Sequence, residues 1–384
     1  MVKRKLRVAL LVETATTYGR EILEGIARYQ STRARWSTFT DERELGAAPP
    51  KWLLDRDWDG VICRTTTPEL AAQILAKQIP TVDLNDLYDD LGLPRIQSDM
   101  RAIGRLAAAH LYERGFRNFA FCGFHHETWS DQRCEGFRNH LLDLGFDAAV
   151  YRSVWRGKSA PIWDVDQRQL TDWLQSLPKP LGLMACNDVR GQQILNACLA
   201  SEIYVPEQVA VIGVDNNQLL CSFSDPPLSS VRPNPQRIGF ESAELLDRLM
   251  SGQTCSEQLR LIEPIEVVVR ASTDALGIDD DLVVEAIVLI RDLACLGISV
   301  QDLVKRLGVS RSTLERRFRQ VVGHSPQQEI RVTQLRRIKT LLRTTELPLA
   351  EIASLTGFEH TEYMTVFFKR LTGIPPNTFR QELN

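Results

Sequence analysis

Short apolar runs alternate with stretches of helical periodicity along roughly the first 270 residues. The runs predict buried strands at residues 8–12, 60–63, 80–84, 119–123, 181–186 and 209–214. The stretches between them predict helices at residues 18–29, 68–77, 99–115, 132–144 and 190–199. Alternation of this kind indicates a parallel sheet with helices on both faces. Because the units are too many for one sheet, we expect an α/β domain of two doubly wound lobes over residues 1–271.

The pattern changes after a polar stretch at residues 272–281, which we interpret as a linker. Helical periodicity then predicts helices at residues 282–293, 300–307, 311–322, 327–343, 349–356 and 361–371. A helix, a glycine turn and a second helix occur twice. Each time the pattern Phe-basic-x-x-x-Gly-x-x-Pro begins inside the second helix and runs past its end. Its landmarks are Gly308, Phe318, Gly323 and Pro326, then Gly357, Phe368, Gly373 and Pro376. Residues 282–384 therefore form an all-α domain with two helix-turn-helix units.

Composition fits a globular protein of two or three domains, with 384 residues, 43% hydrophobic and 25% charged. No run approaches the 18 apolar residues of a membrane span. The apolar run at residues 8–12 is too short for a signal peptide, so it predicts a strand, and we expect a cytoplasmic protein. The eight cysteines contain no Cys-x-x-Cys pair, which favours reduced thiols over disulfides or a zinc site.

Charge is distributed unevenly, although the net charge is only −3. Residues 299–384 hold 14 Lys and Arg against 8 Asp and Glu, a balance of +6, which leaves −9 on the rest. A basic module on an acidic body is typical of a nucleic-acid reader joined to another domain, although a solvated basic face would give the same charge.

Polar and aromatic side chains follow several predicted strands, where doubly wound folds bind ligands. The candidates are Glu13, Tyr18, Arg20, Trp129, Arg133, Asn187, Asp188 and Asp215. Carboxylates, an amide and guanidinium groups bind the hydroxyls of a sugar, and aromatic rings stack on its face. Each carboxylate taken alone is equally well explained as a helix cap. Recurrence at the same topological position favours a sugar site.

Catalysis is not indicated by any motif. We find no Ser-His-Asp set, no metal-ligand cluster and no phosphate-binding glycine loop, and six His are dispersed. We therefore expect no enzyme, no cofactor and no metal. A solute-binding protein for transport would use the same two-lobed core. Such a protein must be exported from the cytoplasm and has no pair of helix-turn-helix units, so the sequence argues against this class.

Several segments of the first domain resemble the effector-binding core of the lactose-repressor family, which is similar to periplasmic sugar-binding proteins. They are residues 98–100 with 110–111, 133–137, 185–188, 211–216 and 226–231. The resemblance covers residues 6–270 and implies that Arg133, Asn187 and Asp215 contact a sugar. The chain departs from that family because no DNA-binding headpiece precedes the core.

Residues 282–384 resemble the arabinose-regulator family of transcription factors, most specifically at residues 357–358, 367–369, 373–376 and 379–380. This resemblance implies two reading helices that enter successive major grooves. The implied DNA-contacting residues are Arg311, Ser312, Glu315, Arg316, Arg319, Thr361, Glu362, Tyr363, Val366 and Lys369. Arg reads guanine and Glu accepts from cytosine, whereas Arg319 and Lys369 suit phosphate. We expect the second helix to contribute less affinity because it has fewer basic groups.

The order of the two domains, with the effector-binding core first and the helix-turn-helix domain second, resembles that of bacterial regulators of pentose utilisation. This resemblance implies a D-xylose-dependent activator that binds operator DNA as a homodimer and contacts RNA polymerase. We expect no membrane partner. Response to another sugar is the alternative, because these residue types do not separate epimers. A second alternative is a cytosolic sugar-binding protein that does not regulate genes.

Overall fold

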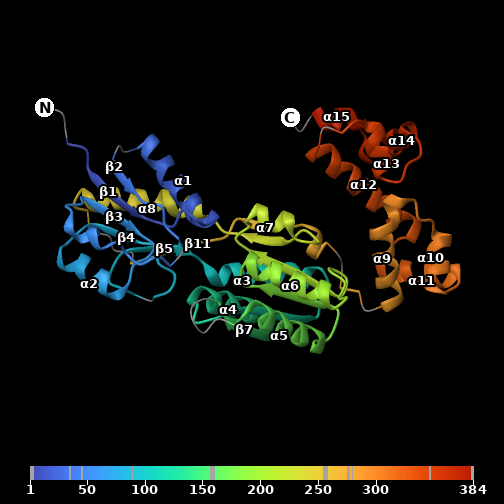
Figure 1. The fold of residues 1–384 in the computed structure, drawn as a ribbon, viewed down its shortest axis with the longest axis horizontal. Helices are drawn as coiled ribbons and strands as arrows, with labels where there is room; N and C mark the ends of the chain where they lie inside the picture. Colours follow the sequence, from blue (N-terminus) through green and yellow to red (C-terminus); the bar gives the residue numbers. More distant parts are fainter. Residues whose placement is uncertain are drawn as a thin grey trace. The chain divides into compact units, whose positions relative to one another are not determined.

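The computed structural model describes residues 4–33, 36–44, 46–88, 90–155, 161–253, 258–274, 277–278, 280–345 and 347–381. The chain forms two compact units, Met1–Ala275 and Leu276–Asn384 (Figure 1). Among the residues described, no helix is both long and apolar enough to cross a membrane.

The first unit contains two lobes, each built on a six-stranded sheet. In the amino-terminal lobe the strand order is β11-β5-β4-β3-β1-β2, and every pair is parallel. The strands are β1 (Arg7–Leu11), β2 (Ser37–Thr40), β3 (Gly60–Cys63), β4 (Thr81–Asp83), β5 (Arg95–Ser98) and β11 (Leu259–Ile262). The helices are α1 (Thr17–Thr32), the short η1 (Lys51–Asp55), α2 (Pro68–Ala76) and α8 (Pro235–Met250).

Alternation along β1 explains why this sheet is covered on both faces. Val8 and Leu10 pack into a core with α1 and α8, whereas Ala9 and Leu11 pack into another with α2. Successive side chains of a strand point to opposite faces, so an unbroken apolar run buries both.

The central lobe has the strand order β12-β10-β9-β8-β6-β7, and β12 alone is antiparallel to its neighbour. Its strands are β6 (Asn118–His125), β7 (Ala148–Val154), β8 (Leu181–Ala185), β9 (Val209–Val214), β10 (Ser229–Arg232) and β12 (Glu266–Val268). Its helices are α3 (Met100–Glu113), α4 (Thr128–Asp143), α5 (Trp163–Ser176), α6 (Asp188–Ala200) and α7 (Gln218–Phe223), with the short η2 (Ala271–Thr273) at its end.

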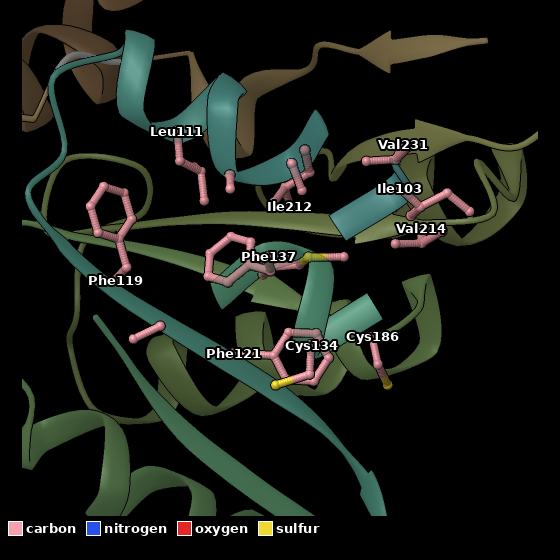
Figure 2. Packing of buried hydrophobic residues seen from close by; sticks show 14 of the residues in the cluster. Ile103, Leu111, Phe119, Phe121, Cys134, Phe137, Cys186, Ile212, Val214 and Val231 are labelled. Carbon is pink, nitrogen blue, oxygen red and sulfur yellow. The ribbon is translucent and has the colours of Figure 1, made fainter. Parts of the chain in front are cut away.

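Two hydrophobic cores hold the central lobe together. One lies between the sheet and helices α3 and α4, where Phe121 and Phe137 pack beside Ile103 (Figure 2). The other lies on the opposite face against α5 and α6 and includes Leu170 and Ile194. The predicted two-lobed α/β class is confirmed.

Facing glycines let one helix pair in each lobe approach closely. A Cβ atom on Gly136 of α4 would lie 2.1 Å from the carbonyl oxygen of Arg101 on α3. In the amino-terminal lobe, a Cβ atom on Gly25 of α1 would lie 2.0 Å from the carbonyl oxygen of Gln236 on α8. No side chain fits at either position, so glycine sets how close these helices lie.

The chain passes between the two lobes at three places in the described residues. It crosses from β5 to α3 at Asp99, from β10 to α8 at residues 233–234, and from β11 to β12 at residues 263–265. Each connection is between one and three residues long. Asp99 also caps α3, because its side chain accepts a hydrogen bond from the backbone nitrogen of Ala102.

The second unit is entirely helical in its described part. Its elements are α9 (Asp281–Leu293), η3 (Ala294–Leu296), α10 (Val300–Leu307), α11 (Arg311–Val322), α12 (Pro326–Thr344), α13 (Leu349–Leu355), α14 (Thr361–Thr372) and α15 (Pro376–Gln381). The predicted helices all occur, with ends that shift by one residue or not at all. The short helix α15 was not predicted.

Helix α12 joins two separate small cores. Ile330 near its start packs with α9, α10 and α11, whereas Ile338 and Leu342 pack with α13 and α14. Between them the buried Gln334 donates hydrogen bonds to the carbonyl oxygens of Ala294 (3.2 Å) and Thr356 (3.1 Å). This side chain ties η3, which follows α9, to the end of α13 within the second unit.

The boundary between the units differs in detail from the expected linker at residues 272–281. Ser272 and Thr273 are fully buried in the first unit, where Ser272 accepts a hydrogen bond from the backbone nitrogen of Ser229. Asp280 belongs to the second unit, because it caps α9 and pairs with Arg317 at 2.6 Å. Asp279, part of the polar stretch that was expected to form the linker, lies outside the described residues.

Candidate ligand cavity and nucleic-acid interface

A cavity of about 180 Å³ lies in the first unit at the carboxyl ends of strands from both lobes. It is smaller than the roughly 300–1,000 Å³ of pockets for drug-sized ligands, so it suits a ligand of monosaccharide size. Its lining residues are Glu13, Thr16, Tyr18, Gly46, Arg64, Asp86, Leu87, Met100, Glu127, Trp129, Arg133, Trp155, Asn187 and Asp215.

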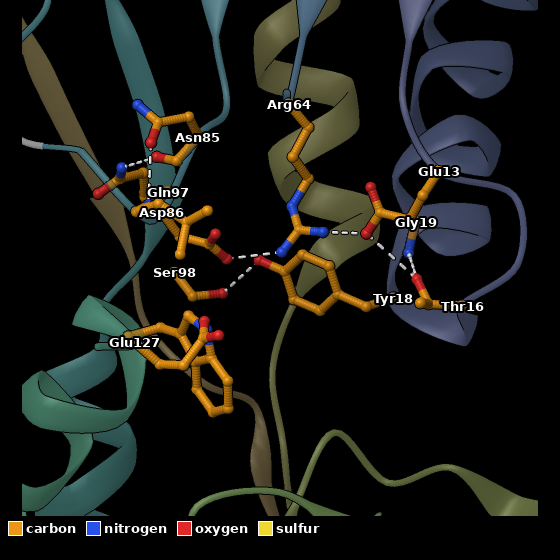
Figure 3. Close-up of polar contacts among 12 residues, drawn as sticks. Glu13, Thr16, Tyr18, Gly19, Arg64, Asn85, Asp86, Gln97, Ser98 and Glu127 are labelled. Carbon is orange, nitrogen blue, oxygen red and sulfur yellow. Dashed lines mark hydrogen bonds and ion pairs between the residues drawn. The ribbon is translucent and has the colours of Figure 1, made fainter. Parts of the chain in front are cut away.

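An arginine whose side chain is 11% exposed organises the wall from the amino-terminal lobe (Figure 3). Arg64 lies between two carboxylates, pairing with Glu13 and, at 2.6 Å, with Asp86. The three follow β1, β3 and β4, which are neighbours in the sheet, so their side chains meet at one edge. The pKa of Arg64 is raised, because the carboxylates of Asp86 and Glu13 outweigh the opposing effect of burial.

Tyr18 lies beneath this arginine. The guanidinium carbon of Arg64 is 4.7 Å from the centre of its ring, and its hydroxyl shares a 2.8 Å hydrogen bond with Ser98. Burial raises the pKa of Tyr18 to about 12, so the phenol stays neutral and able to donate. Glu13, 1% exposed, keeps one oxygen, Oε2, without a hydrogen-bond partner among the described residues.

A second arginine organises the wall from the central lobe. Arg133, 4% exposed, donates to the carbonyl oxygen of Cys186 at 2.6 Å and to Asp215 at 3.3 Å. Its Nε atom has no partner among the described residues. Such unpaired buried groups are costly, so Arg133 Nε and Glu13 Oε2 are suited to the hydroxyls of a bound ligand.

Aromatic rings form the apolar part of the cavity. Trp129 lies four residues before Arg133 on α4, and its ring is 5.1 Å from the guanidinium carbon. Trp155, just past β7, packs edge to face against Trp129 at 5.5 Å and stacks on Phe124 at 5.1 Å. Trp129 also donates to Glu127 at 2.7 Å. The wall is therefore held rigidly from three elements.

Asp215 follows β9 in an unusual backbone conformation. Its φ is +99° and that of Asn216 is +49°, values that non-glycine residues rarely adopt. Arg270 donates to the Asn216 side chain at 2.7 Å and so helps to hold the turn. Burial raises the pKa of Asp215, whereas Arg133 lowers it. Strain of this kind is concentrated at functional sites, and here it presents a carboxylate to the cavity.

The reading face of the second unit lies on helices α11 and α14. In α11, Leu314 and Phe318 are buried, whereas Arg311, Ser312, Arg316 and Arg319 are exposed and Glu315 is half-buried. Arg311 donates to Glu315 at 2.9 Å. In α14, Met364 and Phe368 are buried, Thr361 is half-buried, and Glu362, Tyr363, Val366 and Lys369 are exposed.

Comparison with known proteins assigns all three regions of this architecture. Residues 7–96 match the XylR N-terminal domain, residues 108–273 a periplasmic binding protein-like domain, and residues 303–382 a helix-turn-helix domain. The xylose operon regulatory protein of Haemophilus influenzae is 32% identical over 388 residues, which cover 99% of each chain. The protein of the same name from Escherichia coli is 32% identical over 391 residues, covering 99% of this chain and 98% of that one.

The chain belongs to the xylose operon regulatory protein family. It is a sugar-binding, DNA-binding regulator of transcription and not an enzyme. A solved structure of the xylose-binding transcription activator XylR superposes with a TM-score of 0.84, at 30% identity and 99% coverage of both chains. The transcriptional regulator CelR in complex with cellobiose shares the fold of the core, with a TM-score of 0.57, 24% identity, and coverage of 71% of this chain and 86% of that one.

For this member of the xylose operon regulatory protein family, the structure places most of the predicted ligand residues on the cavity. These are Glu13, Tyr18, Trp129, Arg133, Asn187 and Asp215. Asn187 also caps α6 by accepting a hydrogen bond from the backbone nitrogen of Arg190, so this residue is both a helix cap and part of the cavity wall.

Two predicted ligand residues lie elsewhere. Arg20 is exposed on α1 and donates to the carbonyl oxygen of Thr14. It faces away from the cavity because two residues along a helix rotate the side chain by about 200° relative to Tyr18. Asp188 is buried and accepts from Ser230 at 2.6 Å and from the backbone nitrogen of Asn217 at 2.7 Å. Its carboxylate fastens strand β10 and the turn after β9 instead of facing the cavity.

Sequence reasoning missed several cavity residues of this regulator. Arg64 directly follows β3 and Asp86 closely follows β4, so the strand-end criterion applied to every strand would have found both. Trp155 follows β7, an edge strand that the apolar pattern did not predict. Glu127 immediately precedes α4, which begins at Thr128 and not at residue 132 as expected.

Proposed function

We propose that this protein is a D-xylose-dependent activator of pentose-utilisation genes, acting in the cytoplasm as a homodimer on operator DNA and contacting RNA polymerase. The observation that carries the proposal is the small cavity in which Glu13 and Arg133 keep unpaired polar atoms beside an aromatic wall. The names of the full-length relatives support xylose as the effector.

In this proposal Glu13, Arg133, Asn187 and Asp215 bind the sugar hydroxyls, and Trp129 and Tyr18 contact its ring. Sugar hydroxyls both donate and accept, so acceptors and a guanidinium donor in one small cavity match them. Arg64, held by Glu13 and Asp86, joins this set as a fixed donor. Groups from both lobes contact one ligand, so the ligand favours the arrangement in which both reach it.

The DNA side of the proposal assigns α11 and α14 to the major groove. Arg311, Ser312, Glu315 and Arg316 face bases from α11, and Thr361, Glu362, Tyr363 and Val366 from α14. Arg319 and Lys369 lie one turn further along and contact phosphate. Their exposure beside buried anchors supports this assignment.

Calorimetry with D-xylose, L-arabinose, D-ribose and D-lyxose tests the proposal, with and without operator DNA. We expect D-xylose to bind most tightly and to raise operator affinity by the same factor by which operator raises sugar affinity, as linkage requires. Absence of D-xylose binding at millimolar concentration would overturn the effector assignment. Tighter binding of another pentose would identify that sugar as the effector.

Asp215→Asn, compared with Asp172→Asn on the exposed surface of α5, tests the cavity. We expect a loss of roughly 10- to 100-fold in sugar affinity for the first variant, because a charged hydrogen bond contributes about 1.5–3 kcal/mol. The second variant should bind like the unmodified protein. Equal affinity of the two variants would remove Asp215 from the site.

A further inference from the structure

The two reading helices correspond residue by residue but differ in chemistry. Leu314, Phe318 and the capping Gly323 of α11 match Met364, Phe368 and Gly373 of α14, always fifty positions later. Both glycines end their helices with a φ of +83°. The same offset places Val366 at the position of Arg316, and Tyr363 at that of Thr313.

Val366, which is apolar, and Tyr363, whose aromatic ring carries a hydroxyl at its tip, lie on an open helix face. Their exposed fractions are 67% and 70%, and neither belongs to the hydrophobic core that holds Met364 and Phe368. Three residues apart, they lie side by side on α14. Lys369 and Arg370 are exposed in the last turns of the same helix. The patch formed by Val366 and Tyr363 is therefore flanked by exposed Glu362 in the first turn of the helix and by positive charge in its last turns, which suits a surface that meets phosphates at its carboxyl-terminal edge and base edges at its centre.

Folding does not explain Val366. An exposed valine adds no core contact, and it favours a helix less than alanine does. The major groove supplies a complementary group, because thymine alone among the four bases carries a methyl group there. Polar side chains such as those of Arg311 and Arg316 read hydrogen-bonding atoms, and those atoms are present whether or not the methyl group is.

We propose that Val366, with Tyr363 beside it, reads thymine through its 5-methyl group, so that apolar contact specifies one half-site and hydrogen bonds from α11 specify the other. This inference rests on the proposed DNA-binding role of both helices. It makes Val366 a specificity-determining residue and gives the weakly basic second helix a function in discrimination.

The experiment first selects the preferred operator from random DNA with the full-length protein and D-xylose. Within the DNA segment bound by one copy of the chain, positions that lose preference in Arg316→Ala mark the half-site of α11. The other conserved part of that segment is the half-site of α14. Each thymine there is then replaced by deoxyuridine, which removes only the methyl group, and affinity is measured by fluorescence anisotropy. If no sequence is enriched, the proposed function itself fails.

For the unmodified protein we expect one or two replacements in the α14 half-site to weaken binding about fourfold, which corresponds to one buried methyl group. Val366→Ala should weaken binding to thymine DNA and show no further loss with deoxyuridine. Leu371→Ala, an exposed apolar residue on another side of α14, should keep the full fourfold response. Circular dichroism checks that both variants remain helical.

Two results would overturn the inference while leaving the operator role intact. One is an enriched operator at which no deoxyuridine replacement in the α14 half-site changes affinity. The other is a fourfold response that persists unchanged in Val366→Ala, which would assign the methyl contact to another residue.

Discussion

Substitution of a single polar residue is expected to have different effects in the two units. Inside the first unit, a polar side chain such as that of Asp188 is buried and paired, so a single substitution there changes both charge and structure. On the outer face of α11 and α14 most side chains are exposed, so substitutions on that face change recognition with little effect on folding. Asp188 and Arg316 illustrate the two cases.

The carboxyl of Asp188 has a pKa raised from 3.8 to about 7 by burial and by the nearby Asp215. The folded state then binds the proton more tightly than the unfolded state, so stability falls as pH rises from about 4 to about 7. Asp188→Asn should remove this dependence, and its urea midpoint relative to the unmodified protein should rise between pH 5 and pH 8. Asp172→Asn is the exposed control. An unchanged difference at both pH values would contradict the assignment.

Arg316 lies exposed on α11, where it donates to Gln320 at 3.4 Å. Arg316→Ala should therefore lose roughly 1–3 kcal/mol of specific binding and relax preference at one base position. Arg319→Ala should instead weaken binding to all sequences equally and lower the salt dependence. Gel-shift titration on operator and unrelated DNA separates the two effects. An unchanged operator affinity for Arg316→Ala would refute its role.

Elements position the cavity residues, and helix α4 does so most directly. It carries Trp129 and Arg133 on one face and lies against α3 through Gly136. The distance between these two helices therefore decides where the aromatic wall and the guanidinium lie.

Gly136→Ala should push α4 away from α3, because the new methyl group would overlap the Arg101 carbonyl oxygen. We expect a loss of about 1–3 kcal/mol in the free energy of unfolding and weaker sugar binding together. Asn139→Ala, on the exposed side of α4, is the matched control. Thermal unfolding and calorimetry measure the two effects. Unchanged stability in Gly136→Ala would show that the helices can separate freely.

Strands with unbroken apolar runs were predictable from the sequence, whereas the edge strands β2 and β7, the interior strands β5 and β10 and the helices α5, α7 and α8 were not. Strands β1, β3, β6, β8 and β9 contain apolar runs because both faces of a parallel sheet are buried. Strand β2 reads Ser-Thr-Phe-Thr and lies at a sheet edge with mostly exposed side chains, so no apolar run marks it. Strand β7 also lies at a sheet edge but has mostly half-buried side chains; it was not predicted, and Trp155 directly after it was missed with it.

Contacts between distant residues were beyond sequence reasoning. Tyr18 and Ser98 share a hydrogen bond across 80 positions, and Arg64 meets Glu13 and Asp86 only because β3 lies between β1 and β4. Polarity at strand ends indicates which residues can meet. The order of strands in the sheet decides which of them do.

At the scale of the whole molecule, the two units each have their own cores. The second unit contains two hydrophobic cores joined through α12 and Gln334, so it has the means to fold alone. The cavity lies entirely in the first unit.

Residues 277–384 expressed alone should therefore fold and bind operator DNA with an affinity that D-xylose does not change. Thermal unfolding and anisotropy with and without the sugar check this. The full-length protein, in which D-xylose should raise affinity, is the control. A D-xylose effect on the isolated unit would contradict the location of the effector site, and failure to fold would contradict the independence of its cores.

The three crossings between the lobes also determine the order in which they can be completed during synthesis. The amino-terminal lobe needs α8 and β11, which the ribosome makes only after nearly all of the central lobe. Until then, the apolar face of α1 at Ile22 and Ile26 has no α8 to cover it. The central lobe lacks only β12 and η2 when α8 begins. The middle of the chain is thus expected to fold first, and the amino-terminal segment to wait, which makes it the part most exposed to aggregation and chaperone binding on the ribosome.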